Sequence, residues 1–223
     1  SVTAADEETP ATTDVGRSIR ILATDPATAG VTEAGAVPLD DDRTIEGLYV
    51  DDGQLVTINS TGWWGIWGRV FEDFSTWERQ SVGVQIHDVS DPGSPTKNWD
   101  MEVEGGFVSS RKVGDLIYVV VRHTPDIPEL IYYTDNEDEI AENEALIDAL
   151  TIDDVLPKVT VDGIEEVLLE ADDCFVTDPG HDLAPDERGF PTLTIILAVN
   201  VANPGIVNAA CYNESTDGLY VSA

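Results

Sequence analysis

A nine-residue segment occurs twice in this chain, and no other feature restricts its fold as strongly. Val84–Pro92 (VQIHDVSDP) aligns with Ile196–Pro204 (ILAVNVANP), and the alignment matches Asp88 with Asn200. Each copy is typical of a strand that ends in a turn, because proline removes a donor from the ladder and Asp or Asn closes the turn. Ile19–Pro26 is a degenerate third copy, one residue out of step. We therefore expect a repeated unit of short antiparallel strands.

A second repeated element, a glycine followed by a Tyr-Val strand, comes after each copy. It occurs at Gly47–Val50, Gly114–Val119 and Gly218–Val221. We expect each to run through the middle of the next small sheet, which puts Tyr49, Tyr118 and Tyr220 on equivalent strands. Repeats of one small antiparallel sheet each predict blades of a β-propeller. A β-sandwich with coincidental motifs is the alternative.

The remaining patterns also predict a mostly β chain with one inserted helix. Gly47–Ile58 reads as a hairpin around Asp-Asp-Gly, and Val82–Val89 alternates apolar and polar residues as a half-buried strand does. Leu116–Val121 is a continuous β-branched run that fits a strand buried on both faces. Asp135–Leu150 has helical spacing and is expected to be an insertion between strands.

The expected domain organisation is a flexible acidic leader over residues 1–17 and about three to four blades over residues 18–223. The polar leader is not a signal peptide, so any export signal is expected to have been removed or left out. Three Tyr-Val strands are fewer than the four to eight blades with which propellers close. An incomplete propeller is therefore predicted, whose open sheet edges self-associate or meet missing blades of the same polypeptide.

The stretch Val84–His123 resembles a family of secreted bacterial and archaeal β-propeller domains. In that family a V-x-V-x-D-V-S-D-P strand precedes a G-x-x-V-S-S-R-x-x-G-D-x-x-Y-x-V pair. The matching residues here are Asp88, Asp91, Pro92, Gly106, Val108–Arg111, Gly114, Asp115, Tyr118 and Val120. The likeness covers roughly Arg17 to Ala223 and implies an extracytoplasmic propeller without a catalytic motif. Family members usually run on past the point where this chain stops.

The charge balance excludes several kinds of partner. Forty-four Asp and Glu residues face eleven Lys and Arg, for a formal net charge of −33. Nucleic acids and anionic membranes need clustered cations, which this chain lacks. Its apolar runs also fall short of the roughly 18 residues of a membrane span. The acidity itself is explained by adaptation to salt, by cation binding, or by an ordinary solvated surface.

One acidic loop is the best candidate for a metal site. The possible ligands are Asp178, Asp182, Asp186 and Glu187, in a segment that also contains Gly180. Several oxygen ligands in a short glycine-containing loop suit calcium, although the spacing is not that of an EF-hand. A solvated acidic loop is the alternative.

Clustered tryptophans form the second candidate site. Trp63, Trp64 and Trp67 lie in a glycine-interrupted stretch that reads as a loop. Exposed, they would make an aromatic platform for a carbohydrate or a protein partner. Buried, they would cap the core or cover a sheet edge.

The cysteines and histidines give weaker signals. Cys174 and Cys211 are either one disulfide of an oxidising compartment or two buried thiols. His87 is expected on the polar side of its strand as a surface residue. His123 follows a buried strand and could be a ligand at the rim of the propeller.

Taken together, these patterns favour a non-catalytic, extracytoplasmic β-propeller module with a binding or scaffolding role. The common signatures of hydrolases, metalloproteases and nucleotide-binding proteins do not occur in the sequence. The rival interpretation is a calcium-dependent hydrolase with carboxylates on the axial face of the propeller.

Overall fold

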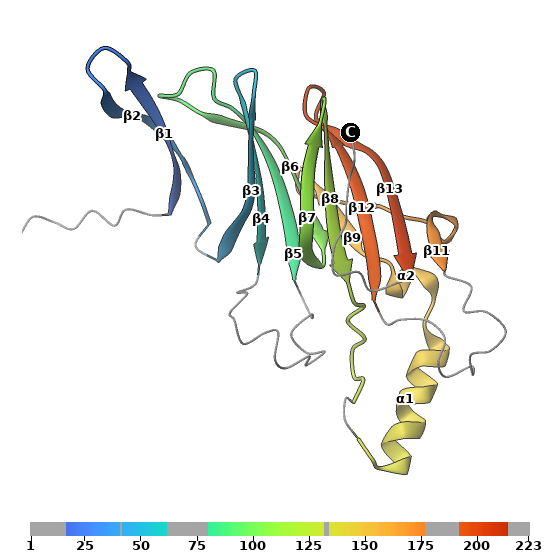
Figure 1. The fold of residues 1–223 in the computed structure, drawn as a ribbon. Helices are drawn as coiled ribbons and strands as arrows, with labels where there is room; N and C mark the ends of the chain where they lie inside the picture. Colours follow the sequence, from blue (N-terminus) through green and yellow to red (C-terminus); the bar gives the residue numbers. More distant parts are fainter. Residues whose placement is uncertain (1–16, 41, 62–79, 132–133, 177–191, 214–223) are drawn as a thin grey trace, which may run out of the picture.

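A computed structural model describes residues 17–40, 42–61, 80–131, 134–176 and 192–213, and these residues form mainly β-strands (Figure 1). The strands make a two-stranded, a six-stranded and a five-stranded sheet. The first contains β1 (Ser18–Asp25) and β2 (Gly30–Pro38). The six-stranded sheet has the order β10-β9-β6-β5-β4-β3, and the five-stranded sheet has the order β11-β13-β12-β8-β7.

Four consecutive strands form the centre of the six-stranded sheet. They are β3 (Arg43–Asp51), β4 (Gln54–Thr61), β5 (Ser81–Asp88) and β6 (Thr96–Glu104), each antiparallel to the next. The expected hairpin is confirmed: Asp51 pairs with Gln54, and Asp52 and Gly53 between them have φ of 43° and 78°. Two positive φ values identify the type I′ turn that matches strand twist.

The same meander recurs in the five-stranded sheet. Its strands are β7 (Gly106–Val113), β8 (Leu116–His123), β12 (Leu193–Asn200) and β13 (Gly205–Asn213). Each again lies antiparallel to its neighbour in the meander. Like β4, β8 is the second strand of its meander, and its alternate residues Ile117, Val119 and Val121 are all fully buried.

The repeat seen in the sequence is confirmed by the register. Asp88 and Asn200 each end the third strand of a meander, where they pair with the first residue of the second strand, Gln54 and Leu116. The next residue in each copy then donates its backbone N–H to the preceding hairpin turn. Val89 donates to the Gly53 carbonyl over 2.7 Å, and Val201 to that of Asp115 over 2.8 Å.

The hairpin β1–β2 is consistent with the third, degenerate copy of the repeat. Asp25 ends β1 and accepts a hydrogen bond from the Ala27 N–H over 2.9 Å, as Asp88 accepts one from the Ser90 N–H over 2.9 Å. The hairpin packs on the β5–β6 connection, because a Cβ added at Gly35 would overlap the Pro92 carbonyl. By this equivalence β1 and β2 correspond to the third and fourth strands of a meander.

The predicted equivalence of the tyrosines is wrong for the two that the structure describes. Tyr49 lies on β3, the first strand of its meander, whereas Tyr118 lies on β8, the second. The residue of β4 that is equivalent to Tyr118 is Val56, because Val56 pairs with Ile86 and Tyr118 pairs with Ala198 at the matching positions of the repeat. The Tyr-Val motif does not mark equivalent strands, because the pair precedes the hairpin turn in one copy and follows it in the other. Tyr220 lies outside the described residues.

Residues between β8 and β12 form an insertion that joins the two large sheets. The insertion contains α1 (Glu137–Ala149), α2 (Ile152–Val155), β9 (Lys158–Val161), β10 (Ile164–Val167), a 3₁₀ turn at Ala171–Asp173 and β11 (Cys174–Val176). Although β8 and β12 belong to the five-stranded sheet, β9 pairs with β6 of the other one. The chain then returns to pair β11 in parallel with β13.

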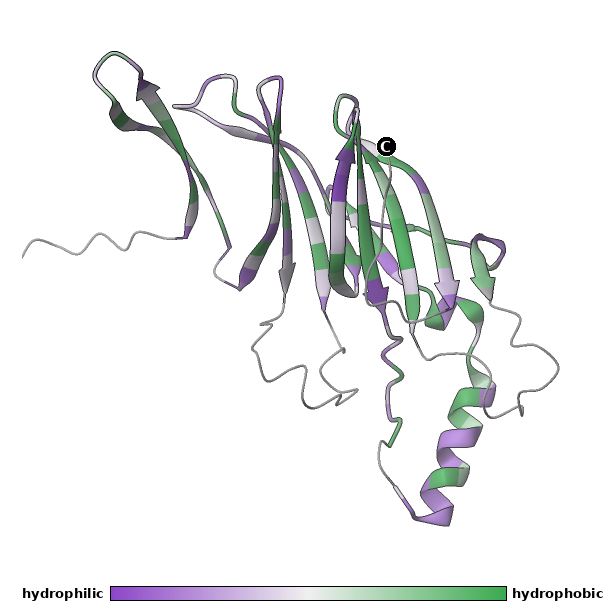
Figure 2. Cartoon of the chain, viewed as in Figure 1, coloured by the Kyte–Doolittle hydropathy of each residue, from purple (hydrophilic) through white to green (hydrophobic). Residues whose placement is uncertain are grey.

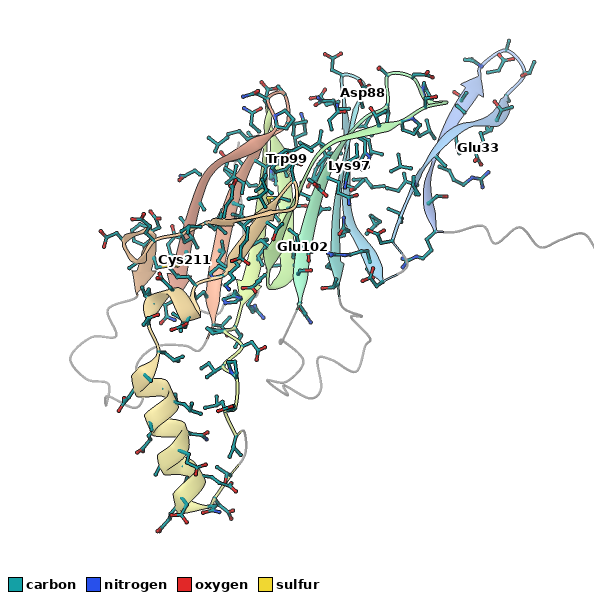
Figure 3. The ribbon with its side chains drawn as sticks, turned by 180° about the vertical axis from the view of Figure 1, so that it is seen from behind. Glu33, Asp88, Lys97, Trp99, Glu102 and Cys211 are labelled. Carbon is teal, nitrogen blue, oxygen red and sulfur yellow. A yellow bond between two sulfur atoms is a disulfide. The ribbon has the colours of Figure 1, made fainter. Side chains whose placement is uncertain are left out.

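The disulfide predicted as one of two alternatives is present. Cys174 of β11 bonds to Cys211 of β13, with their Cα atoms 4.4 Å apart, and Cys211 is fully buried. Figure 3 labels Cys211 beside the returning strand. The bond therefore fastens the end of the insertion to the edge of the five-stranded sheet.

The two large sheets pack against each other through their apolar faces, and Figure 2 shows hydrophobic residues concentrated along β8 and β12. A single residue, Gly105, connects β6 to β7 and has a φ of 124°. From there β7 packs across β5, β4 and β3 of the other sheet. The buried core between the sheets includes Val56, Ile58, Val82, Val84, Ile86, Met101, Val103, Ile117, Val119, Val121, Ile195, Leu197 and Val199.

Helix α1 confirms the expected inserted helix and extends away from the sheets (Figure 1). The Asn136 side chain caps it by accepting from the Asp138 N–H over 3.0 Å. None of its residues is buried, and hydrophobic and hydrophilic residues alternate along it (Figure 2). No helix in the described part of the chain is long and apolar enough to cross a membrane.

Candidate binding cavity

A cavity of about 360 Å³ lies where both large sheets meet the insertion. The six-stranded sheet contributes residues at the start of β5 and the end of β6. The five-stranded sheet contributes the end of β8, and the insertion contributes the end of α1, α2 and the start of β9. The lining residues are Gln80, Glu104, Gly105, His123, Thr124, Asp126, Pro128, Leu150, Asp153, Asp154, Leu156 and Lys158.

His123 forms the innermost titratable part of the wall. It ends β8 on the face that carries Val121 and Val119, so strand alternation turns it toward the core, and only 6% of it is exposed. Burial lowers the pKa of the imidazole, because the charged form loses its hydration. The Glu104 carboxylate and a backbone hydrogen bond with Val155 oppose this shift in pKa.

Glu104, the last residue of β6, joins the sheet to the insertion. Its carboxylate accepts a hydrogen bond from the Lys158 backbone N–H over 2.9 Å. This contact extends the pairing of β6 with β9, in which Val103 lies opposite Val159. Glu104 therefore places a negative charge at the cavity and fixes the position of Lys158.

Helix α2 carries two further carboxylates of the cavity, with different roles. Asp154 accepts hydrogen bonds from the Thr151 N–H over 2.8 Å and the Thr151 hydroxyl over 2.6 Å. These bonds cap α2 and lower the pKa of the Asp154 carboxyl. Asp153 stands beside it on the first turn of the helix. A fourth carboxylate, that of Asp126, comes from the segment after β8.

The described lining of the cavity carries a net negative charge. Among the described residues that line it, there are four carboxylates and one cation, Lys158, whose ammonium also lies 3.9 Å from the Glu165 carboxylate. Helix α1 ends against the cavity at Leu150 and has no basic residue in its last turn. The free carbonyls of a helix C-terminus carry partial negative charge, which adds to that of the carboxylates.

A second, smaller recess of about 260 Å³ lies on the six-stranded sheet, on the face opposite the core. At its centre the Arg43 guanidinium donates to the Asn59 side-chain oxygen over 3.4 Å and pairs with Glu102 at 2.5 Å. Lys97 and Glu102 of β6 both line this recess and are labelled in Figure 3. Its charged groups are thus largely paired with one another.

Both candidate sites singled out in the sequence lie outside the described residues. These are the aromatic platform of Trp63, Trp64 and Trp67 and the calcium loop of Asp178, Asp182, Asp186 and Glu187. Over the residues that are described, no group of three or more His, Cys, Asp or Glu side chains could hold a metal ion.

The two histidines are placed differently from each other. His123 lies in the wall of the cavity. His87 was expected as a surface residue, and that expectation is wrong: it lies on the polar face of β5, as predicted, but only 6% of it is exposed. Burial and the nearby Lys97 lower the pKa of His87, and its Nε2 has no hydrogen-bond partner within the described residues.

Sequence analysis missed the carboxylates around His123. Glu104, Asp126 and Asp153 are 22 or more residues apart in sequence. Pairing of β9 with β6 brings the insertion that carries Asp153 to Glu104, and Asp126 follows the end of β8. One local signal was available, the Asp162-Gly163 pair at the turn of the β9–β10 hairpin. That pair predicts the hairpin but not the sheet on which it docks.

Two repeated four-stranded meanders, packed face to face and preceded by a hairpin of the same type, define a repeat protein of propeller type. The Beta propeller domain family matches residues 5–223, and the chain belongs to this family. The match favours the propeller over the β-sandwich alternative. No curated protein and no solved structure gave a significant match to the chain.

Proposed function

We propose that this chain is a non-catalytic binding module that acts outside the cytoplasm and holds a ligand in the cavity beside His123. The observation that carries the proposal is the construction of the cavity, which needs both sheets and the insertion together. Its volume of about 360 Å³ falls in the range of small-molecule sites. An insertion fastened to both sheets is suited to holding such a site in shape.

The extracytoplasmic location is supported by the disulfide between Cys174 and Cys211. Disulfides persist in oxidising compartments and are rare in reducing ones. The tryptophan platform for a carbohydrate or protein, the calcium loop, and association through open edges or with missing blades remain predictions of the sequence.

Ligand-observed NMR on the full chain tests the proposal. The probes are a panel of small sugars, amines and carboxylates, and the variant is Asp126→Trp, which places a large ring at an exposed position in the lining of the cavity. Asp138→Trp in the first turn of α1 is the matched control, because it makes the same exchange at an exposed position at the other end of the helix from the cavity. We expect at least one class of probe to bind the wild type and the control but not Asp126→Trp.

Two results would overturn the proposal. Probes that bind the wild type and Asp126→Trp equally would remove the cavity from the function. Release of sugar from glycoside substrates in the presence of calcium, abolished by EDTA, would support the calcium-dependent hydrolase instead.

A further inference from the structure

We infer that the cavity beside His123 recognises an organic cation, an ammonium or guanidinium group carried on a short apolar stem. This inference rests on the proposed function, because it names the ligand class of the same cavity. The shared chemistry is that of a free alkyl diamine and of a lysine or arginine side chain of a partner.

Among the described residues that line the cavity, the carboxylates outnumber the cations, and this excess of negative charge favours a cation. Lys158 is the one cation among the described lining residues, and its ammonium lies 3.9 Å from Glu165, outside the lining. Glu104 accepts a backbone N–H from Lys158, and that hydrogen bond leaves its full negative charge in place. Asp153 of α2 adds a second carboxylate to the lining.

The end of α1 strengthens the preference for a cation. The helix stops at Leu150, whose N–H bonds to the Ile147 carbonyl over 3.2 Å, and Leu150 lines the cavity. The last turn of the helix contains no basic residue whose side chain could donate a hydrogen bond to the free carbonyls. A cation in the cavity would therefore lie near the negative end of the helix dipole, where positive charge is stabilised.

The size and lining of the cavity separate an organic cation from a metal ion. About 360 Å³ is roughly twelve times the volume that one water occupies in the liquid. Apolar surface from Pro128, Leu150 and Leu156 gives an alkyl stem something to pack on. Within the described residues the carboxylates do not converge in a group that could hold a metal.

Isothermal titration of the full chain tests the inference. Cadaverine probes the free amine and an acetyl-lysyl-amide peptide probes the side chain, while 1-pentanol and glutarate test a neutral and an anionic group on a similar stem. Calcium chloride at constant ionic strength tests for a metal. We expect both amines to bind, with the tighter one identifying the source, and we expect pentanol, glutarate and calcium to bind at least about tenfold more weakly.

Paired variants locate the site. Glu104→Gln keeps an oxygen that can accept from Lys158, and Asp153→Asn is an isosteric change at an exposed position, so both should fold. Asp138→Asn in the first turn of α1 and Glu166→Gln on β10 remove the same charge away from the cavity. We expect each cavity variant to weaken amine binding about fivefold or more and each control by less than about twofold.

Several outcomes would overturn the inference. It fails if neither amine binds, if pentanol binds as tightly as cadaverine, or if the controls weaken binding as much as the cavity variants, since that would show diffuse attraction to an acidic protein. If sugars bind in a manner that Asp126→Trp blocks while amines do not bind, the binding function stands and only this choice of ligand falls.

Discussion

At the scale of single residues, the two buried histidines make the stability of the folded protein depend on pH near neutrality. His87 and His123 are both held below the ordinary histidine pKa, chiefly because burial penalises the imidazolium. The folded protein therefore resists protonation at these sites more than the unfolded chain does. Between the folded pKa and about 6.5 the unfolded state binds more protons, so stability rises with pH across that range.

Replacing His123 with Gln should flatten this dependence. The wild type is expected to lose stability as pH falls from about 7 toward 5, with His123 contributing a slope of at most about 1.4 kcal/mol per pH unit. Urea unfolding of wild type and His123→Gln at several pH values measures the slope, which is informative even if the variant is less stable throughout. His87→Gln should act in the same direction, and parallel curves for wild type and both variants would contradict the prediction.

Three carboxylates affect stability in a different, more acidic pH range. Hydrogen bonds from neighbouring turns lower the pKa values of Asp25, Asp88 and Asp154. The stability that these groups contribute is present above their unfolded pKa of about 3.9 and is lost as pH falls below it. The histidine slope can therefore be read without interference from them.

What the sequence could predict about the cavity was limited to His123. Its position at the end of a β-branched run placed it where a buried strand meets a loop. Its neighbours could not be predicted in the same way, because Glu104 reaches the cavity through β6 and Asp153 through an insertion. Contacts between residues so far apart in sequence follow from sheet pairing, which no local pattern encodes.

At the scale of elements, the tightest connection in the fold is the one-residue link from β6 to β7. A Cβ added at Gly105 would lie 2.6 Å from both the Arg122 carbonyl oxygen and a Val121 methyl, and its φ of 124° is rarely adopted by other residues. Glycine thus allows the chain to cross from one sheet to the other without displacing β8.

Gly105→Ala should be strongly destabilising. We expect a loss of about 3 kcal/mol or more in the free energy of unfolding, from backbone strain and the steric overlap with β8. Gly163→Ala is the matched control, because it has a φ of 82° but nothing within 4 Å of the added Cβ. That variant should lose about 1–2 kcal/mol, from strain alone. Equal losses in urea unfolding would show that the crossing is not sterically restricted.

The disulfide is a second element-scale constraint, because β11 is held by a three-residue parallel pairing and by the bond itself. Replacing both Cys174 and Cys211 with Ala should cost about 2–4 kcal/mol, since the bond closes a loop over a sequence separation of 37 residues. Urea unfolding of the double variant and of reduced wild type should give matching midpoints. A double variant as stable as the oxidised protein would exclude this role.

The elements themselves divide into those that local pattern predicts and those that it does not. The β3–β4 hairpin, β5, β8 and α1 were predicted because turn residues and periodicity lie within each segment. The docking of β9 on β6 and the parallel return of β11 were not. Both place strands of the insertion beside strands distant in sequence, and the energy that selects those partners comes from the packed core.

At the scale of the whole molecule, repulsion among the many carboxylates destabilises the compact folded state. The net charge is −33, and the surface ion pairs involving Arg20, Lys97 and Lys112 neutralise little of it. Exposed ion pairs contribute about 0–1 kcal/mol each and weaken further with salt. Mutual repulsion among carboxylates is long-ranged at low ionic strength, where the Debye length is about 30 Å at 0.01 M.

The same repulsion bears on the open sheet edges. In the described part of the chain, the six-stranded sheet ends at β10 and β3, and the five-stranded sheet at β11 and β7. β10 is four residues long and carries Glu165 and Glu166, features that discourage pairing with another edge. Self-association through such edges is therefore expected to be weakest at low salt.

Salt should stabilise the protein through screening rather than through a specific ion. We expect the thermal midpoint to rise by about 5 °C or more between 0.1 and 2 M salt, with overlapping curves for sodium and potassium chloride. Glu166→Gln/Asp172→Asn, which removes two exposed carboxylates, should raise the midpoint at low salt and converge with the wild type at high salt. Calcium at constant ionic strength should add nothing that EDTA reverses. A large calcium effect beside a flat sodium chloride series would show instead that the acidity serves specific cation sites.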